Sequence, residues 1–269
     1  MPSRKSGPLA LPVSERQSPL ASATADWQEK KQSMTAAETH IEASDSAAFA
    51  RIVQARRSIR AFLPEPVAPE ILEAVFAEAA RAPSNCNTQP WAVHVASGAA
   101  IEALRQRLPA DFMAGKMRMD FPYDGKYEGV YRERQHAAAR ALYDAMGIAR
   151  EDKAGRHDAF MRNLTFFDAP HVAFLFLPEP FGLREACDLG MFAQTLMLGM
   201  TARGLGSCPQ TALSFQVDQV REILGVDPSL KLLFGISFGY PDPAAGANAC
   251  VTERMPLGDL VSFHQAPSA

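Results

Sequence analysis

The stretch HVAFLFL at residues 171–177 decides the fold, because an unbroken apolar run, rich in strand-forming residues, follows His171. An apolar run of this length without polar alternation predicts a strand that is buried on both faces. It is followed at residues 183–203 by LREACDLGMFAQTLMLGMTAR, which is apolar on most faces of a helix. Such a helix must be covered all round, either by its own domain or by a second subunit.

The elements predicted around this pair are mostly helices. Further strands are expected at residues 91–97 and 231–239, and residues 109–129 predict a long loop, because prolines and glycines break them and four aromatic residues lie among them. Helical periodicity is found at residues 45–57, 69–81, 99–108, 130–147, 151–167 and 217–224. Few strands and many helices favour an α+β domain with a small central sheet over a doubly wound nucleotide fold.

Residues 1–45 differ in composition from the rest of the chain. They are rich in Ala, Ser, Pro and charge and lack apolar periodicity, which predicts a disordered or extended tail ahead of a domain at residues 46–269. Met34 stands just before the globular patterning begins. We therefore expect residues 1–33 to be dispensable for folding.

Charge and cysteine usage exclude several function classes. The net charge of −3 gives no broad basic field, so neither nucleic acid nor a membrane surface is an expected partner. The four cysteines are scattered without a CxxC pair, and no histidine pair has metal-ligand spacing. These patterns favour a cytoplasmic protein without a metal site.

Two familiar motifs occur in contexts that do not fit them. Gly235–Gly239 matches the GxSxG of serine hydrolases, but Pro241 and Pro243 forbid the helix that must follow the nucleophile. Gly204 and Gly206 begin a dinucleotide fingerprint, yet they follow a helix instead of opening one. Gly204 is better interpreted as the residue that ends that helix.

Two polar clusters could hold an anionic, heteroaromatic ligand. Residues 56–60, RRSIR, carry three guanidinium groups and a hydroxyl, which suit a phosphate, although cations at a helix end also complement its dipole. Residues 82–91, APSNCNTQPW, place amides and hydroxyls between prolines, which suits the edge of a ring rich in donors and acceptors. The same residues could equally form an Asx-rich turn anchored by Trp91.

Four motifs taken in order resemble the FMN-dependent nitroreductases. These are RRSIRAF, APSNCNTQPW, GLGSCPQ and ERMPL, and the resemblance spans about residues 46–264. It is nearest to the bacterial branch of nitrobenzoate and nitrobenzene reductases. The resemblance implies an α+β nitroreductase-like fold, with a small central mixed or antiparallel sheet surrounded by helices, in an interlocked homodimer with two flavin sites at the subunit interface.

The resemblance also implies roles for individual residues. Arg56, Ser58 and Arg254 would hold the FMN phosphate with Arg57 alongside, and Arg60 would lie near the flavin pyrimidine ring. Contacts to the same flavin from the other subunit would come from Pro83, Ser84, Asn85 and Asn87. The segment over flavin N5 would comprise Cys208, Pro209, Gln210, Thr211 and Ala212, where main-chain groups matter most. Some members carry Glu at the position of Thr211 and Lys at that of Thr252.

The activity implied is transfer of hydride from NAD(P)H to nitroaromatic or related electron-poor substrates by a ping-pong mechanism. The cofactor would carry the chemistry, so no side-chain nucleophile is expected, and residues 109–129 would cover the exposed flavin face. Within the same fold, a reductase of quinones, enones or a malonic semialdehyde is the alternative. From another class, a non-catalytic flavin-binding protein would need the same phosphate arginines.

Overall fold

The computed structural model describes residues 42–265, so most of the predicted tail, Met34 included, lies outside the described residues. Residues from Ala48 onward form one compact unit, which is described by itself. The first described helix, α2, spans Ala43–Ala55 and begins two residues before the capping position expected at Asp45. The Asp45 carboxylate instead lies in the first turn and accepts a hydrogen bond from the Glu42 main-chain N–H at 2.8 Å.

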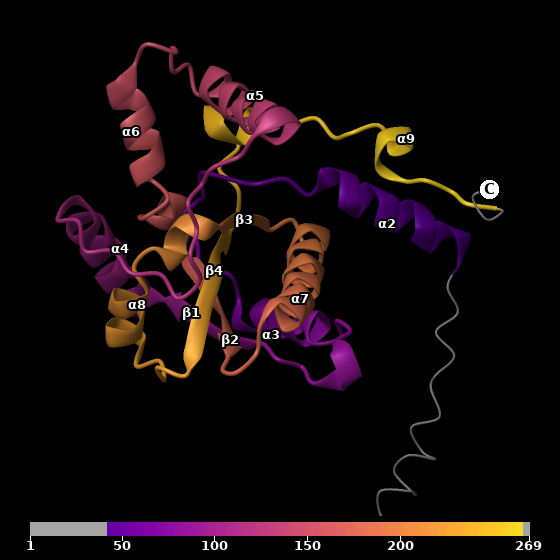
Figure 1. The fold of residues 1–269 in the computed structure, drawn as a ribbon, viewed down its shortest axis with the longest axis horizontal. Helices are drawn as coiled ribbons and strands as arrows, with labels where there is room; N and C mark the ends of the chain where they lie inside the picture. The colour runs from indigo at the N-terminus through magenta and orange to yellow at the C-terminus, as the bar shows by residue number, and fades with distance from the viewer. Residues whose placement is uncertain (1–41, 266–269) are drawn as a thin grey trace, which may run out of the picture. The chain divides into compact units, whose positions relative to one another are not determined.

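The centre of this unit is a four-stranded sheet in the order β1-β2-β4-β3 (Figure 1). Its strands are β1 (Ala92–Ser97), β2 (His171–Pro178), β3 (Gly206–Gln210) and β4 (Leu230–Gly239). Every neighbouring pair is antiparallel, so the small central sheet expected from the sequence is confirmed in its antiparallel form. The predicted short segment GSCPQ is strand β3 at the sheet edge, where Pro209 is tolerated.

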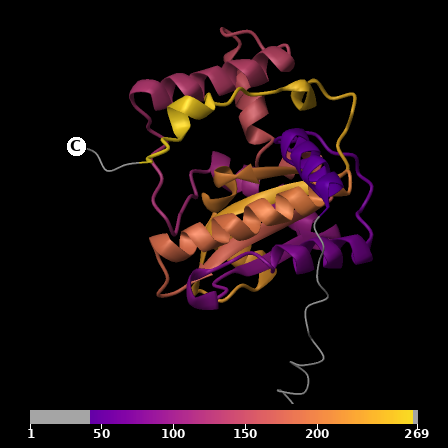
Figure 2. The same ribbon diagram turned by 90° about the vertical axis from the view of Figure 1, so that its right-hand side faces the viewer.

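The strand β2 divides two hydrophobic cores, because its side chains alternate between the two faces of the sheet. Val172, Phe174 and Phe176 pack on one side with helices α4 (Gly98–Met113) and α8 (Val217–Leu224). The intervening residues pack on the other side with α3 (Pro69–Ala79) and α7 (Leu183–Ala202). Figure 1 shows these helix pairs on opposite sides of the sheet, and Figure 2 looks onto the α3 and α7 side.

The long helix α7 is buried along only part of its circumference. Leu189, Phe192 and Leu196 lie in the core, whereas Met191 is 39% exposed and Leu183 is 84% exposed on the other face. The helix ends at Ala202, and Gly204, just beyond the C-cap Arg203, has a φ of +74°, which confirms its predicted terminating role. One chain therefore leaves an apolar strip of α7 uncovered.

Two predicted boundaries were wrong for identifiable reasons. Helix α4 continues through Pro109 to Met113, because the buried Leu104, Leu108 and Asp111 continue its packed face across the proline. The predicted loop 109–129 is therefore residues 114–128. Helix α6 (Lys153–Met161) ends before the predicted residue 167, since Phe166 and Phe167 adopt positive φ angles in the short turn η2 (Phe166–Asp168).

The remaining elements are short or exposed. Helix α5 spans Gly129–Ala145 and α9 spans Leu257–Leu260, and neither contains a buried residue. Single-turn 3₁₀ helices follow strands or turns at η1 (Asn85–Asn87), η3 (Thr211–Ser214) and η4 (Gly246–Ala249). In the described part of the chain, no helix is long and apolar enough to span a bilayer.

Candidate functional site

The Arg56–Arg60 segment lies directly beside the edge strand β3. The Ile59 main-chain N–H donates to Ser207 O at 3.0 Å, and Ser58 forms an isolated parallel bridge with Ser207. Gly206 permits this approach, since a Cβ on it would lie 2.8 Å from the Ile59 side chain. Two motifs that stand about 150 residues apart in the sequence are thereby joined.

Arg56 is half-buried and close to a second cation. Its pKa is lowered first by burial and then by the like charge of Arg254, with a smaller opposing effect from Cys208. Among residues 42–265 no carboxylate forms an ion pair with either arginine, and Arg254 donates only to nearby oxygens of Thr252 and Glu253 at 2.9–3.0 Å. Two neighbouring guanidinium groups without an acidic partner suit a phosphate dianion, so the donor set fits the phosphate of FMN.

Cys208 lies beneath this cluster and is almost fully buried. Burial raises the pKa of its thiol to about 11, and nearby Arg60, Ser58 and Arg56 reduce the rise. The thiol therefore stays protonated at neutral pH and is unsuited to nucleophilic attack. Arg57, in contrast, is exposed and makes no hydrogen bond or ion pair with other residues in the described range.

Asn248 fixes the main chain at Arg60, and sequence reasoning missed it. Its Oδ1 accepts from the Arg60 N–H at 2.7 Å, while its Nδ2 donates to Ala61 O at 2.8 Å and Asp242 O at 2.9 Å. The side chain is buried, so these three bonds satisfy it inside the protein. A single asparagine in the sequence GANA carries no local signal for this role.

The segment after Cys208 presents main chain more than side chains. Pro209 and Thr211 are exposed, but the Gln210 side chain turns inward, where its Nε2 donates to Asn163 O at 3.0 Å and its Oε1 accepts from the Ser237 hydroxyl. Ser237 is the serine of the GxSxG match, and it lies fully buried within β4. That position excludes a nucleophile elbow.

The Pro83–Asn87 turn lies between α3 and β1, and its Asn85 and Asn87 side chains are exposed. Its backbone is unusual, because Cys86, Asn87 and Gln89 have φ angles of +50°, +55° and +47°. Such angles are costly for residues other than glycine and cluster at functional sites. Within residues 42–265 no hydrogen bond or ion pair connects this turn to the arginine cluster.

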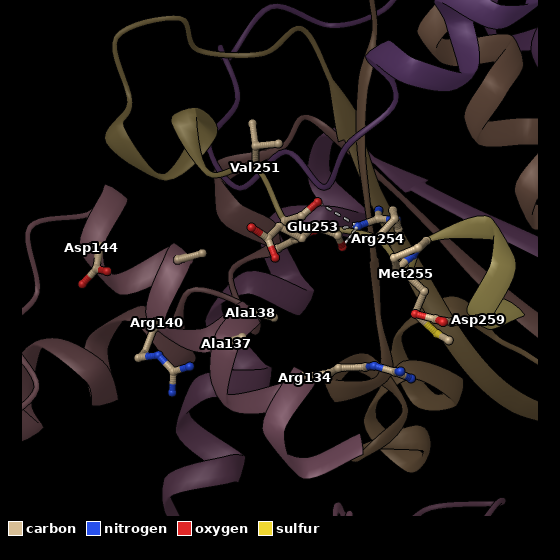
Figure 3. A pocket seen from close by; sticks show the side chains of 13 residues that line it. Arg134, Ala137, Ala138, Arg140, Asp144, Val251, Glu253, Arg254, Met255 and Asp259 are labelled. Atoms are coloured by element: carbon tan, nitrogen blue, oxygen red, sulfur yellow. Dashed lines mark hydrogen bonds between the residues drawn. The ribbon is translucent and has the colours of Figure 1, made fainter. Parts of the chain in front are cut away.

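A cleft of about 590 Å³ opens between helix α5 and the segment at residues 251–259 (Figure 3). Arg254 lies on one wall, and Arg134 and Arg140 of α5 lie on the other. The lining also includes the carboxylates of Asp144, Glu253 and Asp259, so the cleft is mixed in charge. Ala137, Ala138 and Ala141 leave the space open. The sequence signal for this cleft was a set of small residues at helical spacing near Arg134 and Arg140. Neither arginine was predicted to belong to the site.

The loop at residues 114–128 is fixed at its base. Arg118 pairs with Asp218 at the start of α8, and the buried Asp120 accepts from Arg221 Nη2 at 2.8 Å and from the Leu232 N–H at 2.8 Å. Further along, Tyr123 stacks on Phe215 with ring centroids 6.2 Å apart. The part free to cover a ligand is therefore the tip of the loop, next to a smaller pocket of about 370 Å³.

Comparisons with known proteins identify the family of the chain. The model of the nitroreductase family matches residues 53–240. The chain is 46% identical over 214 residues to nitroreductase NfnB of Mycolicibacterium smegmatis, covering 79% of this chain and 91% of that protein. It is 34% identical over 215 residues to a 4-nitrobenzoate reductase of Pseudomonas putida, covering 77% and 90%.

A solved structure gives the same result in three dimensions. The FMN-dependent nitroreductase NfnB from Mycobacterium smegmatis, in complex with NADPH, superimposes with a TM-score of 0.79 at 45% identity, covering 82% of this chain and 99% of that one. The antiparallel sheet between two helical layers is thus the fold of that enzyme. The chain belongs to the nitroreductase family.

Proposed function

We propose that this chain is an FMN-dependent oxidoreductase that transfers hydride from NAD(P)H to nitroaromatic or related electron-poor substrates by a ping-pong mechanism. The observation that carries the proposal is the pair Arg56 and Arg254, which approach one another beside Ser58 without an acidic partner in the described chain. Relatives named as a nitroreductase and as 4-nitrobenzoate reductases favour nitroaromatic substrates over quinones or enones.

The residues divide into three sets. Arg56, Ser58 and Arg254 hold the phosphate with Arg57 alongside, and Arg60 faces the pyrimidine ring. Pro209, Gln210 and Thr211 lie over the reactive edge of the ring. Pro83, Ser84, Asn85 and Asn87 belong to the flavin site of the partner subunit. Within residues 42–265 no hydrogen bond or ion pair joins this turn to the arginine cluster, which supports the last assignment.

When bound, FMN supplies the hydride chemistry, accepting hydride from the nicotinamide and delivering it to the substrate. The residues of the chain would bind and orient the cofactor. Arg60, whose main chain is held by Asn248, would place its guanidinium group near the pyrimidine ring and stabilise negative charge there. The Cys208 thiol remains protonated, and the Gln210 side chain is occupied internally, so main-chain groups of residues 209–211 meet the ring.

The functional unit in this proposal is a homodimer. Large apolar side chains are exposed at opposite ends of the chain, with Phe49 60% exposed in α2 and Phe263 81% exposed after α9. Together with the uncovered face of α7, they provide exposed apolar area of the kind that a stable interface buries. A second copy of the chain would cover them.

A cytoplasmic location is part of the same proposal. All four cysteines are free, and Cys86 and Cys187 are exposed, which suits a reducing compartment.

The absorption spectrum of the purified protein tests the proposal. A flavin-like spectrum that bleaches when NADPH or NADH is added without oxygen, and returns when a nitroaromatic compound follows, is the expected result. A flavin spectrum that neither reductant bleaches would instead indicate a non-catalytic flavin-binding protein. A colourless protein that takes up no FMN would contradict both.

A further inference from the structure

Helix α7 contains a carboxylate in its buried face. Asp188 is only 4% exposed and lies next to Leu189 in the core. A buried carboxylate is unfavourable unless hydrogen bonds or cations compensate for lost water. In the part of the chain that the structure describes, no lysine or arginine pairs with Asp188, and its hydrogen-bond donor is the Asn85 main-chain N–H at 3.0 Å.

That N–H belongs to the turn that presents Ser84, Asn85 and Asn87. Within the turn, Asn87 N donates to Ser84 O at 3.0 Å, Thr88 N donates to Asn85 O at 3.0 Å, and Gln89 N donates to the Ser84 hydroxyl at 2.9 Å. The Asn85 N–H takes part in none of these internal bonds. Asp188 supplies its acceptor from a core helix and so ties the turn to α7.

The turn needs such an external support. Cys86, Asn87 and Gln89 all have positive φ angles, and a non-glycine residue holds this conformation only where its surroundings determine it. The carboxylate lies on the buried side of the turn, while the side chains of Asn85 and Asn87 are exposed on the other. This arrangement leaves both side chains accessible to a ligand, although the Cys86 thiol donates to Asn85 Oδ1 at 3.7 Å.

We propose that Asp188 is a positioning residue, which holds the turn at residues 84–89 in the conformation that binds flavin without touching the flavin itself. The inference deepens the proposed function and depends on it for the identity of the ligand. It assigns to α7 a second task besides core packing: the helix sets the geometry of a flavin-binding turn through one charge-assisted hydrogen bond.

The test uses the full chain with Cys187→Ser, so that Cys86 is the single exposed cysteine and its labelling rate by a thiol reagent reports the turn. Three variants are made in this background. Asp188→Ala removes the acceptor, and Asp188→Asn keeps an acceptor oxygen. Leu189→Ala damages the packing of the same helix and leaves the hydrogen bond intact. Labelling rate, FMN dissociation constant and melting temperature are measured for each.

We expect Asp188→Ala to label faster at Cys86 and to bind FMN about ten- to hundredfold more weakly, as loss of a charge-assisted bond implies. Asp188→Asn should stay within about threefold of the parent, because a neutral acceptor remains. Leu189→Ala should melt earlier with both readouts unchanged.

Unchanged Cys86 labelling in Asp188→Ala would overturn the inference, as would faster labelling with unchanged FMN affinity. If Leu189→Ala changed the labelling rate and the FMN affinity as much as Asp188→Ala does, Asp188 would have only a stability role. That result would also overturn the inference. If the parent protein bound no FMN, the proposed function itself would fail, and the labelling rates would still show whether Asp188 supports the turn.

Discussion

The arginine cluster and the Ser84–Gln89 turn are built in opposite ways. The cluster is assembled inside one chain, where Ser58 and Ile59 run beside β3 and Arg254 arrives from the C-terminal segment. The turn is held from behind by α7 and directs its polar side chains away from the protein. In the proposed homodimer this difference has a simple meaning: each chain would contribute its cluster to one flavin site and its turn to the other.

The largest effect is expected at the cluster. Arg56→Ala and Arg254→Ala should each weaken FMN binding by about ten- to hundredfold, since each removes a charge-assisted phosphate contact. Titration of the apo-protein with FMN measures this. Arg150→Ala is the matched control, because Arg150 is exposed, lies outside the proposed site and makes no hydrogen bond or ion pair within residues 42–265, and it should leave the affinity unchanged. Wild-type affinity in both main variants would remove the phosphate assignment.

A smaller effect is expected from His171, which belongs to neither region. Its Nε2 accepts from the Val67 N–H at 2.9 Å, so the neutral ring carries its proton on Nδ1, which lies 2.5 Å from the Ser97 hydroxyl. Burial lowers its pKa below the ordinary 6.5. As the pH falls from 6.5 toward the lowered value, the unfolded chain binds a proton that the folded chain resists, and the free energy of unfolding decreases.

His171→Leu tests this dependence. At neutral pH the variant should be less stable than the wild type, by roughly 1–3 kcal/mol for each buried polar group left unpaired. Between about pH 8 and pH 5.5, however, its free energy of unfolding should change less than that of the wild type. Melting temperatures across that range measure both. FMN affinity should be unaffected, since the ring lies at the start of β2 and stacks on Phe238. A variant with the full wild-type acid sensitivity would contradict the account of His171.

The smallest effect is expected from removing residues 1–33. A protein that starts at Met34 should keep the flavin content, dimer stability and nitroaromatic reductase activity of the full chain, because neither region includes any of the deleted residues. Gel filtration, flavin absorbance and specific activity measure these properties. The competing hypothesis is an arm that wraps the partner through Leu9, Leu11, Val13, Leu20 and Trp27. Loss of dimer or flavin would support the arm.

The sequence predicted the fold well where patterns are local. The apolar run of β2 and the helical periods of α3, α7 and α8 depend on neighbouring residues, and their boundaries agree within about two residues. Strand β3 was not recognised, because five residues with a proline form a strand only when β4 lies beside them. Helix α4 was ended too early, since packing of its buried face outweighs the local preference of Pro109.

The site was predictable only in part, again because a sequence pattern shows neighbouring residues and not contacts between distant segments. RRSIR and the polar turn stand out because several functional groups are adjacent in the sequence. Asn248 and Asp188 are single residues whose roles arise from contacts with segments 188 and 103 positions away. A lone buried Asn or Asp becomes interpretable only after its hydrogen-bond partner is known.

A heterodimer gives the most direct test of the shared site. One subunit carries Arg56→Ala with Arg254→Ala, the other carries Asn85→Ala with Asn87→Ala, and the two are co-expressed with different tags and purified together. If each turn serves the partner's cluster, one of the two sites combines intact halves. The heterodimer should then bind about one flavin per dimer with near-native affinity, although both parent homodimers bind FMN poorly. Flavin binding no better than in the parents would show that cluster and turn serve the same chain.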